Sequence, residues 1–319
     1  NKTIHLFLER TNATEVWVDS IHFDLQKHLS APHIYDLSEV LTPGQHNLTI
    51  SVDNSPELFP TGGSHALAKH TQTNWNGIIG KLELYAKDEV FIKSLKLIPN
   101  LENKEAKVVF KLVNPNKEHI KGSIVCEAIG FNGNTHNVKK QAFDFSSNES
   151  EILVTGKYKM GDDFNTWDEF NPNLYSFTAK LNAKGASKNY KDNYEASFGM
   201  VKFKTNGTQF VVNDKVTILR GKHDACVFPL TGYPPTTKDE WIRQMKICKD
   251  YGLNHYRFHS WTPPKAAFEA ADIVGVYMQP ELPQWRAFKE KDTLHCYIWS
   301  LHVGLALDGL GPNPALGSV

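Results

Sequence analysis

The segment Leu219-Arg220-Gly221-Lys222-His223-Asp224, with residues 238–285 that follow it, decides the fold of this 319-residue chain. Before this segment, apolar and polar residues alternate in short runs with a period of two, which is typical of β-strands. After it, two helical stretches alternate with short apolar strands. This change of periodicity predicts β-sheet domains first and an α/β region after them.

The α/β region contains the signals of a βαβ unit. Thr237 is placed to cap a helix, with Glu240 as the partner of a capping box three residues later. A strand is expected at 254–258, a helix from Pro264 to Gly275, and a strand at 276–280. Strand, helix and strand in this order predict a parallel sheet with a right-handed crossover.

Chemistry-bearing side chains follow both strands of this unit. Arg257, His259 and Trp261 belong to the end of the first strand, and Glu281 and Trp285 follow the second. Functional groups of parallel sheets gather at the carboxyl ends of the strands. A cation, an imidazole, a carboxylate and two indoles suit a polyol ligand. As an alternative, Arg257 and Glu281 form a buried ion pair that braces the sheet.

Residues 1–99 and 100–200 each predict a β-sandwich. In the first, a strand begins at once and residues 48–52 alternate in polarity, which suits a jelly roll. In the second, the turn signal Asn132-Gly133 separates strands of an immunoglobulin-like sandwich without its disulfide. The aromatic segment 167–175 is expected to form a structural corner.

The motifs in these segments together resemble glycoside hydrolase family 2, the β-galactosidase, β-glucuronidase and β-mannosidase group. They are, in chain order, the loop Thr71–Gly80; the corner Trp167–Tyr175; Phe198-Gly199 with Leu219-Arg220-Gly221 and His223; and Asn254-x-x-Arg257 with Pro263, Asp272, Gly275 and Glu281. The family's usual Ser-His-Tyr-Pro run is replaced by His259-Ser260-Trp261-Thr262-Pro263, which shifts the histidine by one position.

The resemblance implies a multidomain β plus α/β architecture. A sugar-binding jelly roll, N-terminally truncated, would span residues 1–99, and an immunoglobulin-like sandwich would span 100–200. Residues 201–319 would form the first part of a TIM (β/α)8 barrel, incomplete at its C-terminal side.

The function implied by the resemblance is retaining, β-galactosidase-like hydrolysis of a β-linked glycan in carbohydrate catabolism. The family uses one Glu as acid and base and a second as nucleophile. Neither is expected in this chain, where Ser318-Val319 stands at the place of the family's Asn-Glu pair, so no catalytic residue is predicted. We therefore expect an N-terminal piece of a longer enzyme, inactive alone. A non-catalytic carbohydrate-binding module is the alternative.

The candidate substrate-binding residues are Arg257, His259, Glu281, Trp261, Trp285, His223 and Asp224. For His223 and Asp224, a structural role just under the mouth of the barrel is an equal alternative.

The composition of the chain limits the classes of molecule that it is expected to bind. With 35 basic and 35 acidic residues, neither nucleic acid nor an anionic membrane is expected. The expected partner is an oligo- or polysaccharide, and a homo-oligomer is compatible with the sequence. No C-x-x-C pair occurs among the four cysteines, and no cofactor or metal site is predicted. Mg or Na enters through the family resemblance alone. A periplasmic or secreted location is expected, although the sequence contains no signal peptide.

Overall fold

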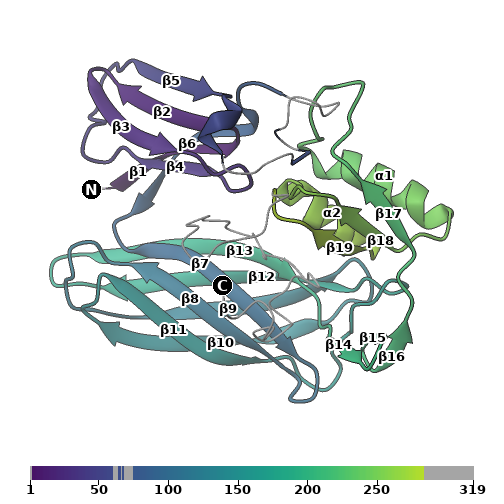
Figure 1. The fold of residues 1–319 in the computed structure, drawn as a ribbon. Coiled ribbons are helices and arrows are strands. Elements are labelled where there is room, and N and C mark those ends of the chain that lie inside the picture. Colours follow the sequence, from purple (N-terminus) through teal and green to yellow (C-terminus); the bar gives the residue numbers. More distant parts are fainter. Residues whose placement is uncertain (1, 60–63, 66, 68–74, 284–319) are drawn as a thin grey trace.

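The computed structural model describes residues 2–59, 64–65, 67 and 75–283. Three parts follow one another along the chain: a first β-sandwich, a second β-sandwich and an α/β part (Figure 1). In this described portion, no helix is long and apolar enough to cross a bilayer.

The first sandwich pairs two three-stranded antiparallel sheets, ordered β4-β1-β6 and β3-β2-β5. Its elements are β1 (Lys2–Arg10), β2 (Ala13–Val18), β3 (Ile21–Gln26), β4 (His33–Asp36), β5 (Leu48–Asp53), the 3-10 helix η1 (Pro56–Leu58) and β6 (Ile79–Asp88). The residues 48–52, which alternate in polarity, lie in β5. Ile50 and Val52 are partly buried there, and their neighbours are exposed. The core between the sheets consists of Leu6, Leu8, Val16, Val18, Tyr35 and Leu37.

The second sandwich has a four-stranded sheet, β10-β9-β12-β13, facing a three-stranded sheet, β11-β8-β7. Its strands are β7 (Phe91–Asn100), β8 (Glu105–Val113), β9 (Ile120–Phe131), β10 (Asn137–Ser147), β11 (Glu151–Lys159), β12 (Leu174–Lys184) and β13 (Asn189–Phe198).

The boundary between the sandwiches lies earlier than predicted. Strand β7 pairs with β8 from Phe91 opposite Val113 to Asn100 opposite Glu105, so it belongs to the second sandwich. The domain therefore begins near residue 90 and not at 100. Pro99 lies inside β7. It is tolerated there because β7 is an edge strand, whose outward N–H groups need no partner strand.

The predicted aromatic corner is structural. Trp167 and Tyr175 are buried in the core of the second sandwich. The Trp167 Nε1–H donates to the Asp272 carbonyl at 2.7 Å, and its ring meets Tyr277 edge-on at a centroid distance of 5.7 Å. The corner therefore also anchors the α/β part to the second sandwich.

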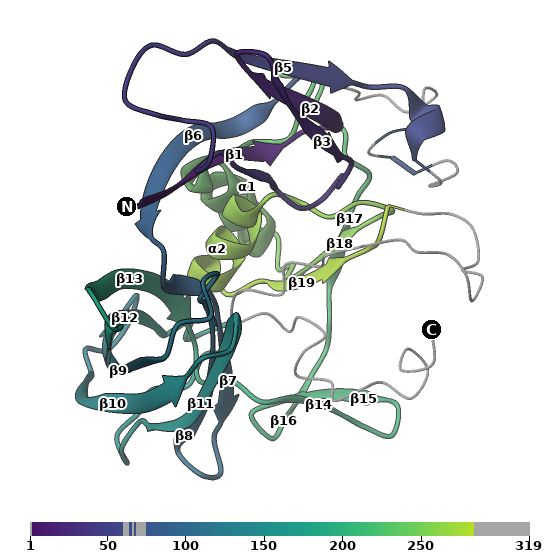
Figure 2. The same cartoon turned by 90° about the vertical axis from the view of Figure 1, so that its left-hand side faces the viewer.

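The α/β part begins with a small antiparallel sheet of β14 (Phe203–Asn206), β15 (Gln209–Val212) and β16 (Lys215–Thr217). A parallel sheet ordered β17-β18-β19 follows. Its elements are β17 (Gly221–Asp224), α1 (Lys238–Asp250), β18 (His255–Phe258), α2 (Lys265–Val274) and β19 (Tyr277–Pro280). Figure 2 shows both helices on the same side of this sheet. The predicted βαβ unit is confirmed. In the described residues the three parallel strands form an open sheet, and a barrel stays a prediction.

The helix ends match the sequence signals only in part. Gly252 and Gly275 follow α1 and α2 with φ values of 77° and 79°, the left-handed conformation that glycine tolerates. The capping box expected at the start of α1 is absent, because the Thr237 side chain makes no capping hydrogen bond. Glu240 pairs instead with Arg243 on the next turn, at 2.6 Å.

Candidate functional site

One face of the β17-β18-β19 sheet is polar and exposed. His223, Arg257 and Gln279 lie opposite one another in the parallel register and are all exposed. Their neighbours Tyr256 and Phe258 point to the opposite face, where the helices bury them. Since side chains alternate between the faces of a strand, the sequence of β18 places Arg257 on the open face.

At the carboxyl edge of this face, four residues form what we call the strand-end cluster: Arg257, His259, Ser260 and Glu281. Glu281 is at its centre. Its Oε1 lies 2.6 Å from Arg257 Nη2, and its Oε2 lies 3.1 Å from His259 Nδ1. The Ser260 backbone N–H donates to the same Oε2 at 2.7 Å. Both carboxylate oxygens therefore have partners, as expected of residues at adjacent ends of parallel strands.

These contacts determine the charge of Glu281. Partial burial by itself raises the pKa of this carboxyl. The Ser260 N–H, His259 and Arg257 together outweigh that effect, so the pKa lies below the ordinary value and Glu281 is ionised at neutral pH. The Arg257–Glu281 ion pair considered as an alternative is present. It is not buried, however, because 44% of the Arg257 side chain and 26% of the Glu281 side chain are exposed.

Two further histidines flank His259. The rings of His223 and His65 each lie 5.0 Å from the His259 ring, measured between centroids. The His65 backbone N–H donates to the Ser260 hydroxyl at 3.1 Å. His223 is thus placed beside the cluster, as predicted. His65 belongs to the first sandwich, and sequence reasoning missed it, although it follows directly on the turn signal Gly62-Gly63-Ser64.

The prediction for Trp261 is wrong. This side chain is fully buried among aromatic neighbours such as Phe228 and Phe258, and its Nε1–H donates to the Asp224 carbonyl at 3.2 Å. Strict alternation along the chain would place it beside Arg257 and His259. Ser260, however, has a φ of 51°, which turns the backbone and sends the indole to the helix side. Trp261 therefore offers no ring face to a sugar.

Asp224 has the structural role that we considered as its alternative. Only 6% of the residue is exposed. Its carboxylate accepts the Cys226 backbone N–H at 3.0 Å and pairs with Lys222 Nζ at 3.0 Å. Both oxygens are thus used to shape the turn after β17. Trp285 and the tail that follows it, including Ser318-Val319, lie outside the described residues.

Among the described residues, no three or more His, Cys, Asp or Glu side chains are grouped so that they could hold a metal ion. We therefore assign no ligand for the Mg or Na implied by the family resemblance.

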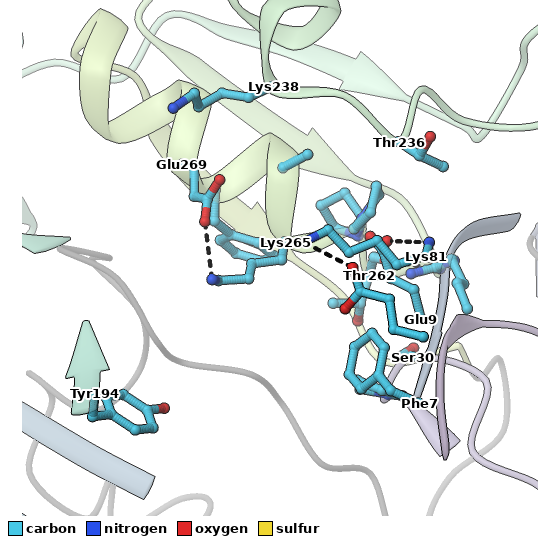
Figure 3. A pocket seen from close by; sticks show the side chains of 17 residues that line it. Phe7, Glu9, Ser30, Lys81, Tyr194, Thr236, Lys238, Thr262, Lys265 and Glu269 are labelled. Carbon is cyan, nitrogen blue, oxygen red and sulfur yellow. Dashed lines mark hydrogen bonds and ion pairs between the residues drawn. The ribbon is translucent and has the colours of Figure 1, made fainter. Parts of the chain in front are cut away.

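A cavity of about 430 Å³ lies between the first sandwich and the segment that runs from Thr262 into α2 (Figure 3). Residues of β1 and β6, among them Arg10, form one wall. Thr262 and the first turn of α2 form the other, and Tyr194 of the second sandwich also belongs to the lining. None of the four cluster residues lines it. The cavity thus marks where the sandwiches meet the loop that follows β18.

Comparison with known proteins agrees with this architecture. Residues 90–200 match the family model described as glycosyl hydrolases family 2, and this range coincides with β7 to β13. The chain is 25% identical over 297 residues to a putative beta-glucuronidase of Formosa agariphila, covering 90% of this chain and 33% of that protein. It is 24% identical over 300 residues to a beta-galactosidase of Thermoanaerobacterium thermosulfurigenes, covering 90% and 40%. The resemblance to glycoside hydrolase family 2 is confirmed.

Solved structures similar to this chain show the same fold. A beta-glycosidase from Bacteroides vulgatus superposes with a TM-score of 0.66 at 20% identity, covering 88% of this chain and 34% of that one. The beta-glucuronidase of Parabacteroides merdae gives a TM-score of 0.68 at 20% identity, covering 92% and 38%. The chain spans about a third to two fifths of the length of these two curated relatives.

Proposed function

We propose that the protein carrying this chain is a retaining O-glycosyl hydrolase of the family 2 type. Its substrate is a β-linked oligo- or polysaccharide, and the reaction is β-galactosidase-like. The observation that carries this proposal is the strand-end cluster. An ionised Glu281, fixed by Arg257, His259 and Ser260, lies at the carboxyl edge of a parallel sheet, where enzymes of this class of fold bind their substrates.

The cluster is suited to orient sugar hydroxyls. A carboxylate accepts hydrogen bonds from hydroxyls, and the exposed guanidinium of Arg257 donates to them. His259 and His223 add ring nitrogens within the same patch. Because Arg257 and Glu281 are fixed against each other before a ligand arrives, less side-chain entropy is lost on binding. We assign Arg257, His259, Glu281 and His223 to substrate positioning.

Bond cleavage in a retaining enzyme requires two further carboxyls about 5 to 5.5 Å apart, one as nucleophile and one as acid and base. We assign neither to a residue of this chain. In this proposal the chain supplies the groups that bind and orient the sugar, and it does not turn over substrate by itself. A periplasmic or secreted location and a homo-oligomeric state complete the proposal and rest on the family resemblance alone.

A non-catalytic carbohydrate-binding module is the second candidate. The observation in its favour is that the strand-end cluster, as described, contains one carboxylate and not a pair. Two β-sandwiches also make up most of the described chain.

The chain itself can be tested with nitrophenyl β-galactoside, β-glucuronide and β-mannoside for hydrolysis, and with the methyl β-glycosides for binding by calorimetry. We expect binding of at least one glycoside, strongly weakened by Glu281→Gln. Glu240→Gln is the matched control, since Glu240 is ion-paired on the exposed face of α1, away from the cluster.

Turnover by the chain that survives Glu281→Gln would contradict the assignment of roles. Absence of binding to all three sugars at millimolar concentration would contradict the proposed function. Binding by the chain, combined with no hydrolysis by any longer protein that contains it, would favour the binding module.

A further inference from the structure

We propose that Arg10, at the end of β1 in the first sandwich, is a positioning residue for Glu281. Arg10 is 4% exposed. Its Nη2 donates to the Thr262 carbonyl at 2.6 Å, a contact between residues 252 positions apart in the chain. Its guanidinium carbon lies 5.7 Å from the ring centre of Trp75 and 5.9 Å from that of Trp261. The first sandwich thus holds the loop that follows β18 through one buried cation.

That loop in turn holds Glu281 at three points. The Ser260 N–H donates to Glu281 Oε2 at 2.7 Å, and the Thr262 hydroxyl donates to the Glu281 carbonyl at 3.0 Å. The Glu281 N–H donates to the Trp261 carbonyl at 3.3 Å. Residues 260–262 therefore fix both the backbone and the carboxylate of Glu281. A displacement of Thr262 would be transmitted to the carboxylate through this short path.

On the helix side the loop is packed through the fully buried Trp261. On the side of the first sandwich, Arg10 and Thr262 both line the cavity of about 430 Å³ (Figure 3). Beside this cavity, two hydrogen bonds reach the loop from the sandwich, in addition to the ring contacts of Arg10 with Trp261 and of His65 with His259. One is the bond from Arg10, and the other runs from the His65 N–H to the Ser260 hydroxyl at 3.1 Å. Ser260 has a φ of 51°, a conformation that non-glycine residues adopt only when their surroundings impose it.

The cost of burying Arg10 argues against a role as simple filler. Burial lowers the pKa of Arg10 to about 10, and its Nε has no hydrogen-bond acceptor among the described residues. An apolar side chain would fill the space between two indoles without this desolvation cost. An apolar residue could supply neither the cation–π contacts with the two indoles nor the hydrogen bond to the Thr262 carbonyl, and the hydrogen bond is the contact that reaches the backbone of the loop.

This inference rests on the proposed function for its effect on sugar binding, but its effect on Glu281 can be measured without a ligand. The experiment uses the full chain with ¹⁵N-labelled histidine, in which His259→Gln identifies the His259 ring signals. Because His259 contacts Glu281, its ring signals report on the carboxylate as the pH is lowered. The variants are Arg10→Met, Arg10→Lys and Thr262→Val, with Arg243→Met as the control on exposed α1.

In Arg10→Met we expect the transition sensed by His259 to move to higher pH, because Glu281 loses part of its alignment with the Ser260 N–H. Arg10→Lys should give a smaller shift in the same direction, and Thr262→Val a similar one, while Arg243→Met should give none. If a methyl β-glycoside binds the parent chain, Arg10→Met should weaken its affinity about tenfold, which corresponds to about 1.4 kcal/mol.

A folded Arg10→Met variant in which the Glu281 transition, sensed at the His259 ring, matches that of the parent chain would overturn the proposal. Should Arg10→Met fail to fold, Arg10→Lys decides in the same way: an unchanged titration overturns the proposal and a displaced one supports it. Since these measurements need no sugar, a displaced titration combined with no glycoside binding would refute the proposed function and leave the role of Arg10 standing.

Discussion

Replacement of Glu281 by glutamine tests the strand-end cluster directly. The variant keeps the size of the side chain but removes its charge and one acceptor oxygen. The new amide nitrogen must face either Arg257 or the Ser260 N–H, so a donor meets a donor. Hydrogen bonds to charged groups contribute about 1.5–3 kcal/mol each. Since both Glu281 and Arg257 are partly exposed, solvent screening reduces this, and we expect Glu281→Gln to lower the free energy of unfolding by about 1–3 kcal/mol in total.

The dependence of this loss on pH distinguishes the cluster from a general packing effect. The folded-state pKa of Glu281 is lowered, so its stabilising contribution is fully present above the pKa of the unfolded chain. That contribution disappears as the pH falls through the folded-state pKa. Glutamine does not titrate. The difference in stability between the parent chain and the variant should therefore be constant at neutral pH and decrease at acidic pH, below about 4.5.

Urea denaturation followed by tryptophan fluorescence at pH 7, 5, 4 and 3 provides the measurement, with Glu240→Gln as a control for an exposed ion pair. A difference in stability that stays the same from pH 7 to pH 3 would refute the electrostatic reasoning. Equal stability of variant and parent at pH 7 would show that the contacts of Glu281 contribute nothing to the fold.

Three further substitutions test the packing beneath the site. Burial raises the pKa of Asp272 well above its ordinary value, so at pH 7 this carboxyl is ionised in the unfolded chain and its ionisation opposes folding. Asp272→Asn should therefore raise the urea midpoint at pH 7 and have little effect at pH 3. Trp167→Phe removes the 2.7 Å hydrogen bond to the Asp272 carbonyl and should cost about 1–3 kcal/mol in the same assay. Gly275→Ala would place a Cβ 2.7 Å from the Glu169 carbonyl oxygen at a φ of 79°. Its thermal midpoint should fall further than that of the control Gly207→Ala, because Gly207 has a φ of 58° but no atom within 4 Å of the added Cβ. Equal losses in the two variants would exclude the clash.

The local parts of the fold could be predicted from the sequence. The spacing of apolar residues that predicts α1, α2, β18 and β19 involves only neighbouring residues. Gly252 and Gly275 likewise end their helices through their own backbone conformations. The placement of Arg257 and Glu281 at neighbouring strand ends followed from the parallel order of the strands alone. These inferences needed no knowledge of distant contacts.

The errors arise where distant residues decide. Trp261 is buried because the left-handed φ of Ser260 interrupts the alternation, and that conformation coincides with contacts from His65 and Glu281, far away in sequence. The second sandwich begins near residue 90 and not at 100 because β7 pairs with β8, a pairing that depends on the order of the sheet. The role proposed for Arg10 depends on a contact across three quarters of the chain. Periodicity and turn signals contain no information of this kind.

The direction of the pKa shift also bears on which carboxyl can break a glycosidic bond. A general acid working near neutral pH needs a raised pKa, so that it still holds a proton when it meets the substrate. The pKa of Glu281 is lowered, and its two oxygens are held by Arg257, His259 and the Ser260 N–H. Oε1 has a single partner, so it keeps a lone pair that can accept a hydrogen bond from a ligand. Glu281 is therefore poorly suited to act as the general acid and well suited to accept hydrogen bonds from a sugar, so we expect the acid of an enzyme containing this chain to be another residue.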